Sequence, residues 1–187
     1  MNAQKNQESD TGMLHPMLKP PNKKSGPTLM SAEFDKAFDF VIVAEGGYTN
    51  DPNDHGGETR FGISKRAFPF IDIKDLTLEQ AGKIYRDHYW DVLPMADLPN
   101  PLAFCLFDTA VNCGVGRAIK LLQMACGVSA DGVVGPITIK AAQEPNVVAK
   151  FMDLRREYYE SLSTFRTFGK GWLKRCDNVE AACYANS

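Results

Sequence analysis

Glu45 is a residue whose type and position together could support acid catalysis. It closes the apolar run FDFVIVAE, after which the sequence changes to the loop-like stretch GGYTNDPNDHGGET. Phe34, Phe38 and Val41 recur at helical spacing, and eleven steps of 100° return Glu45 to within about 20° of Phe34. We therefore predict a helix that ends at the following glycine pair and carries Glu45 on its buried face.

The predicted position disfavours the charged form of the Glu45 carboxyl. Burial penalises an ionised carboxylate, and the negative end of the helix dipole acts in the same direction. We expect both effects to raise the pKa of Glu45. Such a carboxyl stays protonated near neutral pH and can serve as a general acid.

The loop after Glu45 supplies carboxylates in the opposite environment. Asp51 and Asp54 lie among asparagines and glycines, where a carboxylate is solvated and ionised. One acid in apolar surroundings and one carboxylate in polar surroundings form the pair that glycoside hydrolysis uses. Thr59, at the end of the loop, could help to hold the water. Spacing and environment alone leave a plainer interpretation open, in which Glu45 ends a helix and the aspartates form turns.

The elements expected around these residues are mostly helical. Alternation in TRFGI predicts a short strand over 59–63, directly after the loop. Helices are predicted over 77–93, 101–113, 117–126, from 136, over 147–163 and after the segment GKGW. The inner face of the helix over 77–93 is expected to contain Leu78, Ala81, Ile84, Tyr85, His88 and Val92. The predicted fold class is mostly α, with a small β-hairpin or loop element beside the helix that carries Glu45.

Length and composition suit a soluble protein with its own core. A chain of 187 residues can bury about two thirds of its unfolded surface, and no apolar run approaches the roughly 18 residues that span a bilayer. The first residues, MNAQKNQESD, lack the apolar stretch of a secretory signal, so we expect retention in the cytoplasm until something releases the protein. We predict a disordered or extended arm over 1–30, a catalytic lobe over 31–100 and a helical lobe over 101–187.

Charge and metal-ligand spacing argue against several classes of protein. The net charge is −2, and only the arm over 1–30 has a small excess of positive charge. This distribution does not resemble the basic patch of a nucleic-acid-binding protein. The five cysteines are odd in number and show no metal-ligand spacing, which favours reduced thiols. His15, His55 and His88 do not form a metal set, so no metal or organic cofactor is expected. A cysteine peptidase using Cys105 or Cys113 with His88 remains formally open, although buried structural cysteines are much more common.

The stretch EGGYTNDPNDHGGETRFGI resembles the signature of glycoside hydrolase family 108, a group of phage and prophage muramidases. The pattern E-G-G-Y-x-N-D-P-x-D-x-G-G-x-T-x-x-G-I is met at every fixed position. The resemblance implies a lysozyme-like fold and hydrolysis of the β-1,4 bond between N-acetylmuramic acid and N-acetylglucosamine in peptidoglycan, with Glu45 as general acid. In tailed-phage lysozymes eight residues separate the catalytic Glu and Asp, and this spacing selects Asp54 over Asp51 as the second carboxylate. Thr59, one residue nearer to Asp54 than in those lysozymes, is taken as the water-positioning hydroxyl, and Glu58 as a surface residue.

The second half of the sequence carries a further resemblance. FDTAVNCGVGRAIKLLQ, DGVVGPIT and GKGWLKR are similar to a predicted peptidoglycan-binding segment of these enzymes, so the resemblance covers about residues 33–180. It implies a phage-type endolysin that binds peptidoglycan glycan strands as a monomer without stable membrane insertion, and that reaches the wall through a holin-dependent lesion. The alternatives are a non-catalytic peptidoglycan-binding protein and a wall hydrolase of another type, either a transglycosylase or an amidase.

Four further residues are candidates for substrate binding. Tyr48 could stack on a sugar, and Asn50 lies beside it in the loop. Asp108 and Asn112 are four residues apart and share a helix face. They either line the glycan groove or form a satisfied polar pair inside the core. Trp172 is expected to anchor the last helix to the core.

Overall fold

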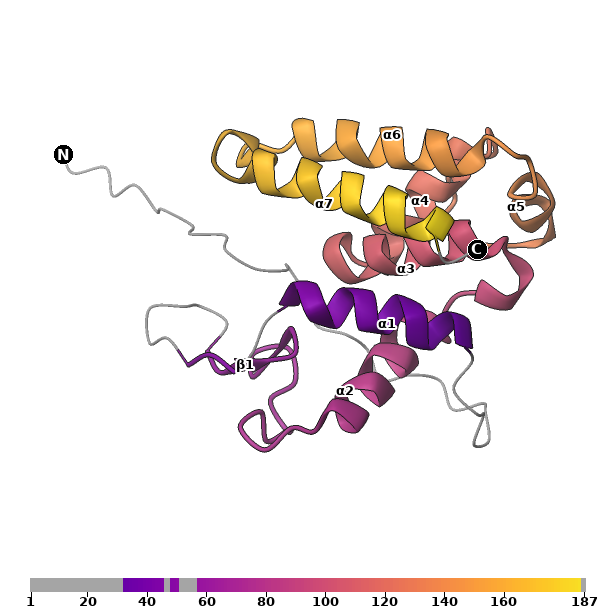
Figure 1. The fold of residues 1–187 in the computed structure, drawn as a ribbon. Coiled ribbons are helices and arrows are strands. Elements are labelled where there is room, and N and C mark those ends of the chain that lie inside the picture. The colour runs from indigo at the N-terminus through magenta and orange to yellow at the C-terminus, as the bar shows by residue number, and fades with distance from the viewer. Residues whose placement is uncertain (1–31, 46–47, 51–56, 186–187) are drawn as a thin grey trace.

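The computed structural model describes residues 32–45, 48–50 and 57–185, and these form a mostly helical protein with a small antiparallel sheet (Figure 1). The expected fold class, with its small β-hairpin beside the first helix, is confirmed. The elements are α1 (Ala32–Glu45), β1 (Thr59–Arg60), β2 (Ile63–Ser64), α2 (Leu78–Tyr85), the π-helical segment η1 (Arg86–Trp90), the 3-10 turn η2 (Met95–Asp97), α3 (Asn100–Cys113), α4 (Val115–Ala125), α5 (Pro136–Ala141), α6 (Val147–Glu160) and α7 (Phe165–Ala185).

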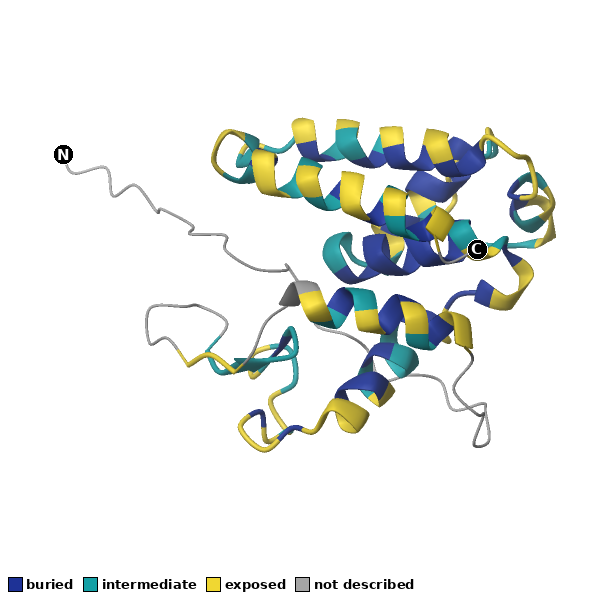
Figure 2. Ribbon diagram, in the orientation of Figure 1, coloured by how far each residue is buried: buried dark blue, intermediate teal, exposed yellow. Residues whose placement is uncertain are grey.

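Helix α3 forms the centre of the molecule. Every residue from Leu102 to Val111 is buried, so this helix is covered on all sides (Figure 2). It packs against α1 and η1 on one side and against α4, α6 and α7 on the other. Pro101 lies in its first turn, and Gly114 at its end has a φ of 82°, as the sequence predicts for the two ends.

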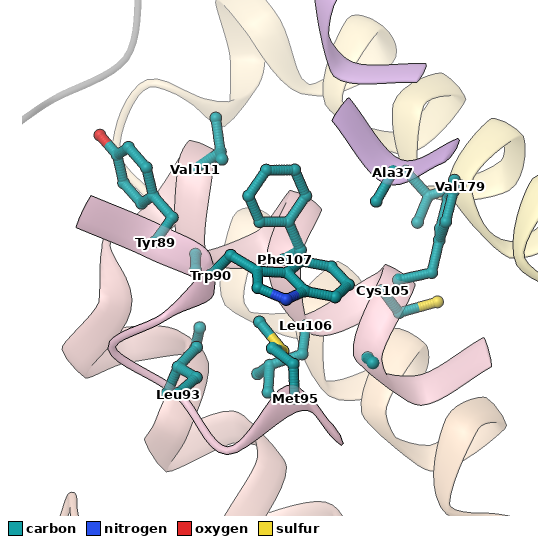
Figure 3. Packing of buried hydrophobic residues seen from close by; sticks show 14 of the residues in the cluster. Ala37, Tyr89, Trp90, Leu93, Met95, Cys105, Leu106, Phe107, Val111 and Val179 are labelled. Atoms are coloured by element: carbon teal, nitrogen blue, oxygen red, sulfur yellow. The ribbon is translucent and has the colours of Figure 1, made fainter. Parts of the chain in front are cut away.

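Aromatic side chains fasten α1 to α3. The rings of Phe34 and Phe38, both buried, stack with centroids 5.6 Å apart. Phe34 also meets Phe107 of α3 edge-on at 5.8 Å. Trp90 packs edge-on against Phe107 at 5.4 Å in the middle of this cluster (Figure 3). These contacts set the course of α1, whose last residue is Glu45.

The hairpin replaces the single strand predicted over 59–63. Thr59 pairs with Ser64 and Arg60 with Ile63, so the chain reverses at Phe61 and Gly62. Both turn residues have positive φ, 52° and 72°, which matches the twist of a two-residue hairpin loop. The Tyr85 hydroxyl donates to the Phe61 carbonyl at 2.9 Å and fixes the turn against α2. The prediction of one continuous strand was wrong because alternation does not reveal a turn built partly on a non-glycine residue.

The helix predicted over 77–93 is α-helical only as far as Tyr85. Its start is confirmed, because the Thr77 and Gln80 side chains each bond to the other residue's backbone N–H, at 3.2 and 2.9 Å. The next turn is π-helical, and the wider turn rotates the residues that follow. Tyr89 and Trp90 therefore point inward, whereas Val92, expected on the inner face, is 48% exposed. Leu78, expected on the same face, is also 48% exposed, at the first position of α2.

Helices α6 and α7 pack together over the far side of α3. Trp172 of α7 stacks on Tyr159 of α6 with centroids 5.1 Å apart, as expected for an anchor of the last helix. Helix α7 begins at Phe165, so the prediction that the helix follows GKGW was wrong. Gly169 is buried inside α7, and an added Cβ would lie 2.4 Å from the Phe165 ring. Among the described residues, no helix is long and apolar enough to span a membrane.

Candidate active site

Thr49 and Thr59 clamp the two ends of the loop that follows α1. The Thr49 N–H donates to the Thr59 carbonyl at 2.8 Å, and the Thr59 N–H donates to the Thr49 carbonyl at 2.9 Å. Thr59 also pairs with Ser64 on its other side. β1 therefore lies between Thr49 and β2, and the loop over 50–58 leaves and returns at one point.

The Thr59 side chain is half-buried beside this clamp. Its hydroxyl donates to the Gly57 carbonyl at 3.3 Å. A hydroxyl that donates in this way still has its oxygen lone pairs as acceptors. The backbone of Thr59 is thus held on both sides, and its side chain keeps the chemistry that a water-positioning group needs.

Tyr48, just before the paired threonines, and Glu58, just inside the loop, meet at the base of the loop. The Tyr48 hydroxyl donates to Glu58 Oε1 at 3.0 Å, and the ring is 42% exposed. Partial desolvation raises the pKa of Tyr48, and the Glu58 carboxylate raises it further, while a hydrogen bond with the Asn50 side chain acts in the opposite direction. Tyr48, Asn50 and Glu58 are therefore brought together at the loop base.

Glu58 was predicted to be a surface residue, and its contact with Tyr48 was not predicted from the sequence. The contact follows from the antiparallel pairing of Thr49 with Thr59, which places their neighbours Tyr48 and Glu58 diagonally opposite each other. That pairing joins residues ten positions apart across a glycine-rich loop, so it cannot be recognised from periodicity.

One proposed carboxylate precedes this clamp in sequence, and the other lies in the stretch between its two threonines. Glu45 ends α1, four residues before Thr49, and its side chain lies outside what the structure describes. Asp54 and Asp51 also lie outside the described residues. The catalytic roles of Glu45 and Asp54 stay predictions.

Asp108 lies in the core rather than on a groove. Its carboxylate is 1% exposed and forms ion pairs of 2.7 Å with both Arg155 of α6 and Arg175 of α7. Burial raises the pKa of Asp108, but the two guanidinium groups outweigh burial and leave it below its ordinary value. The Asn112 side chain donates to the Asp108 backbone carbonyl at 2.7 Å. The sequence left two interpretations open for Asp108 and Asn112, a glycan groove and a polar pair inside the core. This placement agrees with the second.

Arg155, whose side chain is fully buried, was not predicted from the sequence. The signal for it was spacing, since Arg155 follows Phe151 by four residues and precedes Tyr159 by four on the apolar stripe of α6. Its partner Asp108 interrupts the apolar run of α3 in the same way. A buried charge on each of two helices points to an ion pair between them.

The cysteine-peptidase alternative has no support in the structure. The Cys113 thiol donates to the Tyr159 hydroxyl at 3.3 Å, and the His88 ring packs edge-on against Phe68 at 5.3 Å. Burial raises the pKa of Cys113 and lowers that of His88. A thiolate–imidazolium pair needs the opposite shifts. Within the described part of the chain, no cluster of three or more His, Cys, Asp or Glu could hold a metal ion.

The fold and the clamped loop after α1 define a class of protein, the lysozyme-like glycoside hydrolases. The model of the family Glycosyl hydrolase 108 matches residues 38–114, and the model of the Predicted Peptidoglycan domain matches residues 117–177. The solved structure of Brucella abortus SagA is similar to this chain at 36% identity and a TM-score of 0.73, covering 82% of this chain and 95% of SagA. No curated protein matches the chain.

The chain belongs to glycosyl hydrolase family 108. It is therefore a glycoside hydrolase that acts on peptidoglycan, and the second matched domain supports peptidoglycan as its partner. The two matched segments meet at the junction between α3 and α4. The division of the chain at residues 100 and 101 stays a prediction.

Proposed function

We propose that this protein is an N-acetylmuramidase, which hydrolyses the β-1,4 bond between N-acetylmuramic acid and N-acetylglucosamine. The observation that carries the proposal is the position of the clamp. Helix α1 ends at Glu45, and four residues later the chain is fixed by the pairing of Thr49 with Thr59. The loop that contains Asp54 therefore begins and ends beside the C-terminus of the helix that carries Glu45.

The roles follow from the environments of the two carboxyl groups. Glu45, at the negative end of α1, protonates the leaving glycosidic oxygen. Asp54, in the polar loop, either attacks the anomeric carbon or activates water. A separation of about 5–5.5 Å between the carboxyl groups goes with retention, and about 6.5–9.5 Å goes with inversion. In the inverting case, the Thr59 hydroxyl accepts a hydrogen bond from the attacking water.

Tyr48 and Asn50 contribute to sugar binding at the base of the loop. The Tyr48 ring is partly exposed, and its bond to Glu58 limits its rotation. An aromatic face held in this way offers a flat apolar surface to a pyranose ring. Asn50, exposed beside it, offers an amide for hydrogen bonds to sugar hydroxyls or acetamido groups.

The biological setting that we propose is that of a phage-type endolysin. The protein stays in the host cytoplasm as a monomer until a holin-type lesion opens the inner membrane. The resemblance of the EGGY signature to phage and prophage muramidases supports this setting. Expression in a Gram-negative host with and without a holin tests it. Lysis only when the holin is present is expected, and lysis at the same rate without it would contradict the release mechanism.

Product analysis of purified peptidoglycan tests the proposed bond specificity. After digestion and borohydride reduction, the proposal predicts muramitol at the new chain ends. Glucosaminitol would indicate cleavage of the other glycosidic bond, anhydromuramic acid would indicate a transglycosylase, and released stem peptide would indicate an amidase. Wall binding without any new chain end would support the non-catalytic alternative. Each of these four outcomes would overturn the muramidase proposal.

A further inference from the structure

Two cysteines from distant parts of the sequence meet between α3 and α7. Cys105 of α3 and Cys183 of α7 are 0% and 1% exposed. Their thiols are hydrogen-bonded to each other. The Cys183 thiol also lies 3.1 Å from the Glu180 carbonyl, to which it donates. All five cysteines of the chain are described, and none is in a disulfide.

The two thiols differ in acidity. The hydrogen bond with Cys183 and burial raise the pKa of Cys105 well above its ordinary value. The same hydrogen bond lowers the pKa of Cys183 and outweighs burial and the Glu180 carboxylate, which both raise it. Burial raises the pKa of each of the other three thiols, Cys113, Cys126 and Cys176. Thiolate character is therefore concentrated on Cys183, and thiolate is the form that attacks disulfides.

Cys183, although only 1% exposed, lines a small pocket. A small pocket between α1, α3 and α7 is lined by Glu33, Lys36, Trp90, Asn100, Phe104 and Cys183. Two exposed side chains of opposite charge, Glu33 and Lys36, lie at this pocket. A reactive thiol reached through a pocket, with a second thiol in contact behind it, is the arrangement of a redox-sensitive cysteine pair.

We propose that Cys183 and Cys105 form a reversible disulfide that ties α7 to α3 when the protein meets a small-molecule disulfide. The Cys183 thiolate attacks one sulfur of the oxidant, which gives a mixed disulfide and one released thiolate. Cys105 then attacks the Cys183 sulfur and displaces the second thiolate. The two protons of the cysteine thiols end on the two released thiols, so two protein thiols and one oxidant disulfide become one protein disulfide and two small thiols.

The disulfide would join positions 105 and 183 and so close a large loop that contains α4, α5 and α6. Cross-links that close long loops restrict the unfolded chain most. The disulfide would tie down the C-terminal helix and would not involve the loop after α1. The proposal of the disulfide is therefore independent of the proposed bond specificity. Its consequence is a protein that gains stability on passing from a reducing to an oxidising environment.

Disulfide mapping of the full chain tests this proposal. The protein is incubated with oxidised glutathione, blocked with an alkylating agent and digested without reduction. Chymotrypsin cuts after Phe107 and separates Cys105 from Cys113, while a glutamate-specific protease cuts after Glu180 and separates Cys176 from Cys183. We expect a linked peptide pair containing Cys105 and Cys183, with the thiol count falling from five to three. The Tm should rise by roughly 10 °C and return after dithiothreitol.

Variants provide the matched controls. Cys183→Ser and Cys105→Ser should abolish the linked peptide and the rise in Tm, whereas Cys126→Ser, at the end of α4, should leave both unchanged. Five remaining thiols, a stable glutathione adduct without closure, or a link between other cysteines would each overturn the proposal. Because the mapping uses the wild-type chain, it decides the question even if a serine variant fails to fold.

Discussion

Asp108 and Arg155 form an ion pair of 2.7 Å inside the protein, where their side chains are 1% and 0% exposed. Arg175 binds the same carboxylate at 2.7 Å. Arg155 also donates to the Tyr159 hydroxyl at 3.2 Å. Because these residues come from α3, α6 and α7, the Asp108 carboxylate connects the central helix to two of the helices that pack against it.

Asp108→Asn should destabilise the protein and leave its catalysis intact. Removing one partner leaves the Arg155 charge buried with less compensation, which costs about 3–5 kcal/mol. We expect the Tm to fall by about 10 °C, with kcat/KM of the folded enzyme within twofold of wild type. Asp153→Asn is the control, because Asp153 is 72% exposed in its pair with Arg156 and should matter by less than about 1 kcal/mol. An unchanged Tm with a lower kcat/KM would instead support a role for Asp108 in the glycan groove.

The pH dependence of stability should report the same carboxylate. Burial raises the pKa of Asp108, but Arg155 and Arg175 outweigh it, so the folded-state pKa lies below the ordinary value. A depressed pKa contributes stability above the unfolded-state value of about 3.9 and loses it as the pH falls further. The Tm gap between wild type and Asp108→Asn should be constant from about pH 7 to 5 and should shrink below about pH 4. A gap that closes by pH 6 would rule out this account.

The helices could be predicted wherever periodicity and end signals agree. Phe34, Phe38 and the glycine pair after Glu45 define α1, and Pro101 and Gly114 define α3. One error arises where local geometry departs from regular structure. The π-turn after Tyr85 rotates the inner face, and no single residue type encodes such a turn.

The pairing of Thr49 with Thr59 shows why the contacts at the candidate site could not be predicted from the sequence. Thr59 was selected by resemblance, but its pairing with Thr49 is a contact across a loop. The same holds for the Tyr48–Glu58 bond and for the pairing of Asp108 with Arg155. These contacts depend on how distant segments meet, whereas sequence patterns report which residues share a face of one element.

Two glycines of α7 should respond in opposite ways to alanine. A Cβ at Gly169 would lie 2.4 Å from the Phe165 ring, so Gly169→Ala must displace that ring and should cost about 1–3 kcal/mol. No atom lies within 4 Å of a Cβ at Gly171, which is exposed in the same helix. Gly171→Ala should therefore stabilise the protein by about 1 kcal/mol through helix propensity. Thermal unfolding of both variants measures the difference, and equal effects would contradict the close contact with Phe165.

The Tyr48 ring should matter more than its hydroxyl. Tyr48→Ala removes the proposed sugar-stacking face, and we expect kcat/KM on peptidoglycan to fall by about tenfold, or 1.4 kcal/mol. Tyr48→Phe loses only the bond to Glu58 and should stay within about threefold of wild type. Phe70→Ala, which removes a fully exposed ring elsewhere in the same lobe, is the control for general loss of surface aromatics. If Tyr48→Ala equals wild type, Tyr48 does not bind the glycan.

The most direct test of the account compares two glutamates on α1. Glu45 ends the helix, and Glu33 is exposed in its first turn. The measurement is the rate at which purified variants create new muramic acid reducing ends in peptidoglycan, with Tm and wall binding recorded alongside. We predict that Glu45→Gln loses roughly 10²–10⁴-fold in rate while folding and wall binding are retained, and that Glu33→Gln stays within twofold. A folded Glu45→Gln that creates reducing ends as fast as wild type would contradict the assignment of Glu45 as the general acid.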